Sequence, residues 1–455
     1  MKRSKKDIIQ NIIILILLLA SPVLFSLFIG LNFPTHAKSE AVFDRLWIVG
    51  NSAESIDYDI RESLALPIAI AYRNDDLLLA AYANDTLIST IYTEFDNVIT
   101  DIFGKESKIS ESGLNASAAA ALLDDSPGLI YFKYASPLPY PVICACALGS
   151  EAVSSDFSEA PSIYVEAIAL LTEDDGEKTT ARVLIFGMDG KIYESTVKNG
   201  DRLVISYADT AYLDAYSDSF SKAEFIFNDG SAAPFISAGA IAYSELKCTS
   251  YPEAFGEDAA DLPELFGMNP EKTSSYIDHN NTTVFVSSSA SLKLTAEGEV
   301  FFDSESGGEL SFKKLLGYSK PGKSRYDLFD MLNAAVKFTE LLNDSFPELS
   351  DSSVLRITAF SKDESGLVII ELSKYNNGIR IDTAPYRLTF GRNGLVSAVF
   401  GCTRFEALPE RFAALPIGMI YKRLTSKSET VNWIEPIYTK AEAADDTYTL
   451  SFAVG

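Results

Sequence analysis

The sequence predicts an α+β protein in which an N-terminal transmembrane helix precedes two or three extracytoplasmic domains of antiparallel sheets and packed helices. Two observations lead to this prediction. An uninterrupted apolar run occupies residues 12–31, and glycine-containing turn dipeptides then recur between apolar segments, with helical patterns in separate blocks. Because tight turns of this kind join antiparallel strands, and because the helices are segregated from them, the pattern is typical of α+β domains.

The apolar run reads IIILILLLASPVLFSLFIGL. At about 1.5 Å per residue, a helix of this length crosses a hydrocarbon core of about 30 Å. Four basic residues lie within the first six positions and a lone Lys38 follows the run, which predicts a cytoplasmic N-terminus and an exterior location for the rest of the chain. A cleaved signal peptide ending near Ala37 is the alternative, but its apolar region would span only about seven to fifteen residues.

Two small residues, Ser26 and Gly30, lie one helical turn apart within this run. Small side chains let membrane helices approach closely, so this face is a candidate for packing against another span. The alternative is that small residues in a single span have no such role.

The chain carries 38 basic and 63 acidic residues, a net charge of -25. Such a surface repels nucleic acid, and the sequence has no basic, aromatic-interleaved stretch that would bind it, so nucleic-acid binding is excluded. Four cysteines are a poor disulfide framework for this length, and buried free thiols are predicted instead. His36 and His279, the two histidines, stand apart from finger-like ligand spacing, so the sequence predicts no metal and no other cofactor.

Changes in composition divide the chain into four parts. Breaks are predicted near 150–162, which contains Ser, Asp and Pro, and near 250–264, which is acidic and contains two prolines. The predicted parts are the cytoplasmic N-terminus and transmembrane anchor (1–37), a mixed α+β domain (38–155), a second α+β domain (156–250), and C-terminal α+β domains of antiparallel hairpins and helices (251–455).

Periodicity and turn residues place the elements within these parts. Strands are predicted at 43–50, at 66–83 as a pair joined at an Asn-Asp turn, and as a final pair at 433–440 and 447–454. Hairpins are predicted at Asp189-Gly190, Glu297-Gly298 and Asn393-Gly394, where Asp-Gly and Asn-Gly accept positive φ at little cost. Helices are predicted at 86–103, 208–218, 324–344 and 406–425.

One motif match is complete, because residues 317–324 read GYSKPGKS and fit the phosphate-binding pattern G-x-x-x-x-G-K-[ST]. Lys323 would reach the outer phosphates and Ser324 would hold Mg²⁺. However, the preceding SFKKLL is a poor buried strand, and the segment is predicted to face the side of the membrane without ATP. We therefore predict a Gly/Pro turn in which Ser324 or Asp327 caps the following helix.

Other catalytic patterns are weaker. The S-x-x-K match at 311–314 lacks its partner motifs, and His279 is predicted to lie in an exposed turn. Carboxylate pairs such as 174–175, or Glu340 with Glu371, cannot be distinguished from a solvated acidic surface without geometry. The sequence therefore predicts no catalytic residue.

The order of the segments resembles that of a known family. It combines a short basic N-terminus, one span and a C-terminal half with FGMNPEKTSSYIDHNNTTVFV (266–286), LKLTAEGEVFF (292–302), a helix at 327–342 and a strand, turn and returning strand around Tyr375, Gly378 and Tyr386. This layout resembles the YycH and YycI proteins, membrane-anchored accessory regulators of the essential cell-wall two-component system of low-GC Gram-positive bacteria. Residues 38–249 have no matching segment in that family.

The resemblance implies regulation without catalysis, in which the outer domains and the span bind a sensor histidine kinase and a sister YycI/YycH-like protein in the membrane. Two alternatives remain open: an extracytoplasmic cell-wall hydrolase or transferase that uses paired carboxylates, and an envelope or sporulation scaffold. A deep pocket with two acids about 5 to 10 Å apart would favour the enzyme.

Overall fold

The computed structural model describes residues 66–74, 77–82, 87, 91, 96–103, 108–148, 163–174, 179–197, 201–205, 220–227, 233–237, 239–250, 261–317, 326–346, 353–427, 431, 433–442 and 446–454. They all belong to the unit Asp57–Gly455. The predicted membrane span with Ser26 and Gly30, the predicted strand at 43–50 and the predicted helix at 208–218 lie outside them. Among the helices in these ranges, none combines the length and the apolar composition that a membrane span needs.

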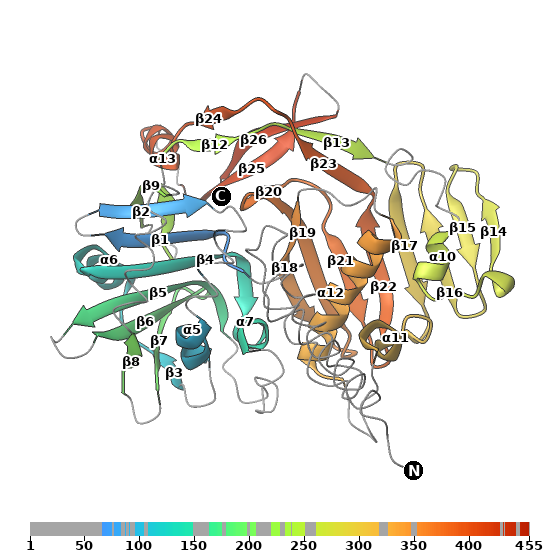
Figure 1. Ribbon diagram of the computed structural model, residues 1–455, viewed down its shortest axis with the longest axis horizontal. Coiled ribbons are helices and arrows are strands. Elements are labelled where there is room, and N and C mark those ends of the chain that lie inside the picture. The colour runs from blue at the N-terminus through green and yellow to red at the C-terminus, as the bar shows by residue number, and fades with distance from the viewer. Residues whose placement is uncertain are drawn as a thin grey trace, which may run out of the picture. The chain divides into compact units, whose positions relative to one another are not determined.

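An antiparallel sheet, which we call the N-terminal sheet, contains nine strands within the described residues (Figure 1). Its strands are β1 (Ala69–Asn74), β2 (Leu77–Tyr82), β3 (Lys108–Glu111), β4 (Gly128–Pro139), β5 (Tyr164–Asp174), β6 (Thr179–Gly187), β7 (Ile192–Thr196), β8 (Leu203–Ile205) and β9 (Ser221–Lys222). They are ordered β3-β7-β6-β5-β4-β1-β2-β9, with β8 paired to β6. The accompanying helices are α5 (Asp96–Phe103), α6 (Ala116–Asp125) and α7 (Tyr140–Leu148).

Both faces of the N-terminal sheet are buried, and β4 shows why. Ile130 and Phe132 point into one hydrophobic cluster, whereas Leu129 and Tyr131 point into another, as alternation along a strand requires. The predicted strand pair at 66–83 is confirmed as the β1–β2 hairpin. β4 and β5, which flank the domain boundary predicted at 155, are hydrogen-bonded neighbours in this sheet.

A second sheet, the C-terminal sheet, contains thirteen strands within the described residues. They are β13 (Leu246–Ser250), β14 (Ser274–Ile277), β15 (Thr283–Val286), β16 (Ala290–Leu294), β17 (Glu299–Ser304), β18 (Val354–Lys362), β19 (Val368–Asn376), β20 (Ile379–Ile381), β21 (Tyr386–Phe390), β22 (Leu395–Gly401), β23 (Thr403–Ala407), β25 (Ile434–Lys440) and β26 (Thr447–Val454). Their order is β14-β15-β16-β17-β22-β21-β19-β20-β25-β26-β13-β23, and β18 pairs with β19. The pair β20–β25 is parallel, and the other pairs of this sheet are antiparallel.

Short elements complete the described part of the chain. Two small sheets pair β10 (Glu224–Ile226) with β11 (Phe235–Ser237) and β12 (Ile241–Tyr243) with β24 (Phe412–Ala414). The helices are α10 (Leu262–Leu265), α11 (Phe312–Leu316), α12 (Leu328–Ser345) and α13 (Ile417–Thr425), with a 3₁₀ turn, η4, at Pro270–Lys272. The described part of the chain is therefore mostly antiparallel sheet with few helices, which confirms the predicted α+β class at that level.

The three predicted hairpins are confirmed as β6–β7, β16–β17 and β21–β22. Gly190 and Gly298 have φ of 77° and 85°, as the turn chemistry predicts. Gly394 is needed for a different reason, because a Cβ there would lie 2.3 Å from the carbonyl oxygen of Leu310. Gly394 is therefore required because two backbone segments pass close together, and not because the turn needs a left-handed φ.

The helix predicted at 324–344 is confirmed as α12. Asp327 caps it, because its side chain accepts a hydrogen bond from the Asp330 amide while the Asp330 side chain accepts one from the Asp327 amide. Ser324, the other proposed cap, lies outside the described residues. The helix predicted at 406–425 is wrong over its first half, since β24 occupies Phe412–Ala414 and α13 begins only after Pro416.

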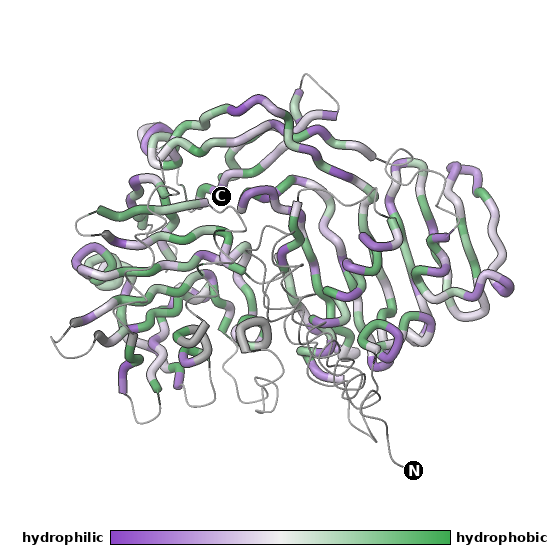
Figure 2. Tube along the Cα trace, viewed as in Figure 1, coloured by the Kyte–Doolittle hydropathy of each residue, from purple (hydrophilic) through white to green (hydrophobic). Residues whose placement is uncertain are grey.

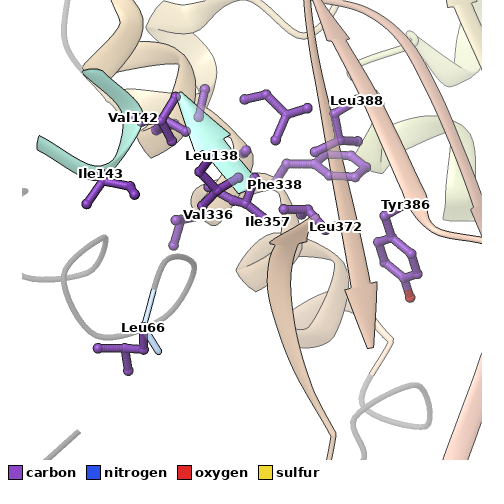
Figure 3. Packing of buried hydrophobic residues seen from close by; sticks show 14 of the residues in the cluster. Leu66, Leu138, Val142, Ile143, Val336, Phe338, Ile357, Leu372, Tyr386 and Leu388 are labelled. Carbon is purple, nitrogen blue, oxygen red and sulfur yellow. The ribbon is translucent and has the colours of Figure 1, made fainter. Parts of the chain in front are cut away.

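One hydrophobic cluster contains residues of both large sheets and of the helices between them. Figure 3 shows Leu138 and Val142, from β4 and α7, in this cluster with Phe338 of α12 and Ile357 of β18. Hydrophobic residues follow the strands of both sheets, whereas many turns are hydrophilic (Figure 2). The two sheets therefore share a core in addition to having their own.

Candidate functional site

Charged and phenolic side chains gather where the two large sheets meet, and we call this group the junction cluster. The N-terminal sheet contributes Tyr82, Tyr131, Lys133 and Glu166, and the C-terminal sheet contributes Arg356, Tyr375, Arg380 and Glu435. The sheets are in direct contact here, because β18 lies against β4 and the Tyr375 hydroxyl donates a hydrogen bond of 3.4 Å to the carbonyl oxygen of Ala135.

An irregularity in strand pairing positions the N-terminal half of this cluster. Lys133 of β4 pairs with Ala167 of β5, but the next paired residues are Leu138 and Val165. Four residues of β4 therefore face the single residue Glu166, and the β5–β6 register shifts at the same place. Bulges of this kind bend a strand and redirect side chains. This one places Glu166 next to Lys133 and carries the 134–137 segment toward β18.

Two glutamates of the junction cluster, Glu166 and Glu435, both interact electrostatically with Lys133. Burial raises the pKa of Glu435, while the positive charges of Lys133 and Arg380 lower it in part. Burial likewise raises the pKa of Glu166, which Lys133 also opposes. Glu435 is half-buried as a residue, yet its Oε1 is shielded from solvent and has no hydrogen-bond partner. Lys133 is therefore the cation that links the carboxylates of the two sheets.

The tyrosines of the cluster are neutral hydrogen-bond donors. Burial raises the pKa of Tyr82, Tyr131 and Tyr375 above the ordinary value, and neighbouring carboxylates raise it further. The Tyr82 hydroxyl donates to the carbonyl oxygen of Ile236 at 2.7 Å, and the Tyr131 hydroxyl donates to that of Pro234 at 2.8 Å. Both bonds attach β11 and the residue before it to the N-terminal sheet.

This arrangement can bind protons and can hold two sheets together. Raised carboxyl pKa values are frequent at functional sites, but buried ionic networks with a structural role have them as well. The cluster bridges the two large sheets, and the charge of Lys133 acts on both glutamates. Its evident chemical property is that the two glutamates favour their neutral forms more than exposed glutamates do.

The S-x-x-K match has a structural role. Ser311 occupies the N-cap position of α11, and the Lys314 ammonium donates a hydrogen bond of 2.6 Å to the carbonyl oxygen of Glu309. Gly317, the first residue of the phosphate-loop match, ends α11 in a left-handed conformation with φ of 73°. Lys323 and Ser324 lie outside the described residues.

The remaining sequence candidates lie apart from the junction cluster. His279 is exposed in the β14–β15 turn, as predicted. Glu340 pairs with Lys337 at 2.7 Å, and Glu371 lies 3.6 Å from Arg387, so these glutamates form separate ion pairs.

The predicted buried free thiols are confirmed for Cys144 and Cys402, and burial raises the pKa of Cys144 to about 12. Cys248 is free and half-buried, and the side chain of Cys146 lies outside the described ones. In the ranges that the structure covers, His, Cys, Asp and Glu side chains form no group of three that could hold a metal ion.

Reasoning from the sequence missed Lys133, Glu166 and Glu435. The only available signal was a single charged residue inside an apolar strand, as in YFKYA, YVEAIALL and IEPIY. Such a residue is buried with a partner or faces solvent, and the sequence alone does not identify the partner.

Comparison with protein-family models, with curated proteins and with solved structures finds no match to this chain.

A first prediction concerns the pH dependence of Glu435. A carboxyl whose pKa is raised on folding stabilises the protein below its unfolded-state pKa and loses that contribution as the pH rises through its folded-state pKa. We expect Glu435→Gln to be more stable than the parent at pH 8, because glutamine keeps the shape without the buried charge. The advantage should shrink as the pH falls and the parent carboxyl becomes neutral.

Urea denaturation of the purified chain between pH 4.5 and 8 measures this difference. Glu299→Gln, in an exposed position on β17, is the matched control and should follow the parent throughout. An advantage of Glu435→Gln that stays constant with pH would contradict the assigned direction of the pKa shift.

Proposed function

We propose that this chain is a non-catalytic, membrane-anchored regulator whose outer part modulates a sensor histidine kinase of cell-wall homeostasis through protein contacts. The anchor and the orientation rest on the sequence of the first 38 residues. The partners, a sensor kinase and a sister YycI/YycH-like protein, rest on the resemblance of the segment order.

One observation supports the non-catalytic part of the proposal: several candidate reactive side chains in the described part of the chain have structural partners. Lys314 binds the Glu309 carbonyl oxygen, and Glu340 pairs with Lys337. The positive charge of Lys133 acts on Glu166 of the same sheet and on Glu435 of the other sheet. These interactions support a structural role for the side chains, and a regulator of this kind would act through its surface.

The experiment that tests the proposal compares cells that contain and lack the chain. Under cell-wall stress, we expect removal of the chain to change the phosphorylation of the response regulator served by the kinase. Crosslinking in native membranes should recover the kinase with the full-length chain. An unchanged phosphorylation level in cells that lack the chain would contradict the proposal.

The paired-carboxylate enzyme is a second candidate, and the raised pKa values of Glu166 and Glu435 favour it. It predicts that Glu166→Gln and Glu435→Gln each abolish an activity on purified peptidoglycan. The regulator predicts that the full-length chain releases no fragment from peptidoglycan and that both variants keep their effect on kinase output.

A second prediction concerns the membrane span. We expect Ser26→Leu combined with Gly30→Leu to leave the chain in the membrane, because leucine is at least as compatible with lipid as glycine. Association with a partner span should weaken by about 1 to 2 kcal/mol, roughly ten-fold, since close backbone approach is lost. Quantitative co-purification from detergent-solubilised membranes measures the change.

The matched control is Leu24→Ile with Phe28→Leu, because in the proposed helix residues 24 and 28 would lie about half a turn from Ser26 and Gly30, on the opposite face. This control should co-purify like the parent. If the Ser26→Leu and Gly30→Leu variant also does so, the span is only a tether, and the regulatory contacts lie in the outer part of the chain.

A further inference from the structure

The strand β14 forms one end of the C-terminal sheet. Its four residues are all exposed, with Tyr276 at 56% and Ile277 at 67% of full exposure. On one side it pairs with β15, and no other strand in the described part of the chain pairs with its outer side. An edge strand with free backbone groups is a template for another extended segment.

The backbone of β14 directs specific groups outward. The Asp278 amide donates to the carbonyl oxygen of Thr282, so the backbone N–H of Asp278 points toward β15. The direction of the backbone hydrogen-bonding groups alternates along an antiparallel strand. The amide and carbonyl of Tyr276 therefore also point toward β15, whereas those of Ser275 and Ile277 point away from it. The free edge therefore presents two donors and two acceptors at the spacing of a sheet ladder.

The hairpin that holds this edge is locally fixed. The Asp278 carboxylate accepts hydrogen bonds from the Asn280 and Thr282 amides at 2.8 and 3.0 Å. These backbone donors, with that of Thr282 the strongest, hold the pKa of Asp278 below its usual range. Asn281 adopts a positive φ of 60°, which asparagine tolerates better than most residues. A preformed edge reduces the ordering that a binding partner must impose.

Four other edge strands of the large sheets are protected in ways that β14 is not. β3 has Lys108 and Glu111 at its ends, and Glu111 pairs with Lys191 at 2.8 Å. β23 carries the Arg404–Glu406 ion pair at 2.9 Å. The edge strand β18 lies against β4, and β9 is only two residues long. Charge, cover and short length discourage strand addition, whereas β14 has the uncharged sequence SSYI.

We infer that the β14 edge binds an extended segment of a different membrane protein by β-strand addition, an inference that rests on the proposed function and names its contact surface. Tyr276 and Ile277 point to opposite faces of the sheet, so the bound segment would contact apolar side chains on both faces. The segment should therefore be rich in β-branched residues. Its ends should be neutral or basic, because this chain is acidic. A second copy of this chain is the disfavoured occupant, because two chains of net charge -25 repel each other.

The test uses the full-length chain in native membranes, with a photoreactive benzoyl-phenylalanine in place of Tyr276. Ser275→Pro removes one outward amide and leaves the bonds to β15 intact, while Ser275→Thr is the matched control. Ile277→Lys is a second variant that adds an edge charge without altering the backbone. We expect one adduct with a different protein, reduced at least five-fold by Ser275→Pro and by Ile277→Lys but retained in Ser275→Thr, with the crosslinked peptide rich in β-branched residues.

Three results would overturn the inference: no adduct, an adduct between two copies of this chain, or an adduct that neither Ser275→Pro nor Ile277→Lys reduces. Response-regulator phosphorylation, measured in the same cells, separates this inference from the proposed function. If deleting the chain changes phosphorylation while the edge variants keep the parent level, the regulator stands and the β14 edge is not its contact.

Discussion

Phe338→Ala is expected to destabilise the protein by about 3 to 5 kcal/mol, the range for removing a fully buried aromatic ring. Phe338 lies on α12 with no exposed surface. Its ring centroid is 5.6 Å from that of Phe266 and 6.1 Å from that of Phe400 (its surroundings are shown in Figure 3). The substitution leaves a cavity between α12 and the C-terminal sheet, in the cluster that also contains β4 and α7.

Urea denaturation of the purified chain, followed by far-ultraviolet circular dichroism, measures the loss. Leu341→Ala is the matched control, because Leu341 lies on the same helix and is 39% exposed. It should change the free energy of unfolding by less than about 0.5 kcal/mol. Similar losses in both variants would mean that α12 contributes through its helical propensity and not through its buried face.

Local chemistry explains which parts of the fold the sequence could predict. Tight turns such as Asp189-Gly190 act within a few residues, so the hairpins they form were predicted correctly. The cap proposed at Ser324 or Asp327 and the helical pattern that follows it likewise predicted α12. Signals of this kind need no knowledge of distant segments.

Long-range pairing explains what could not be predicted. β13 pairs with β23 and β26, and β20 pairs in parallel with β25, and no local pattern encodes such partners. The bulge that places Glu166 beside Lys133 depends on how β4 bends toward β18. The helix predicted across 406–414 was wrong because pairing with β12 overrides the apolar spacing of that segment.

The β14 edge illustrates the same limit. The segment TSSYID contains Thr, Tyr and Ile, which favour strands, but such a preference does not indicate which strand lies at the edge of a sheet. Pairing with β15, which contains Val284 and Phe285, makes it a strand. Exposure of the edge follows from its place at the end of the sheet order.

Lys133→Met is expected to cost about 2 kcal/mol at pH 8, less than the roughly 3 to 5 kcal/mol for breaking a fully buried ion pair, because Lys133 is only half-buried. Methionine keeps most of the apolar stem of lysine, so the change removes the charge more than the packing. Glu166 and Glu435 then lose their shared cation, and the pKa of both carboxyls should rise further above the ordinary value. A carboxyl with a raised pKa favours the folded state only while protonated, so the deficit should be largest at pH 8 and smaller at pH 4.5.

Urea denaturation at both pH values tests this expectation, with Lys247→Met as the control, since Lys247 is an exposed lysine on strand β13. Adding Glu435→Gln to Lys133→Met should recover more stability at pH 8 than the same substitution adds to the parent, because without Lys133 the Glu435 carboxylate has lost a neighbouring positive charge. If the two substitutions are instead additive, Lys133 and Glu435 do not interact, and the contact between Tyr375 and Ala135 together with the shared hydrophobic core joins the sheets.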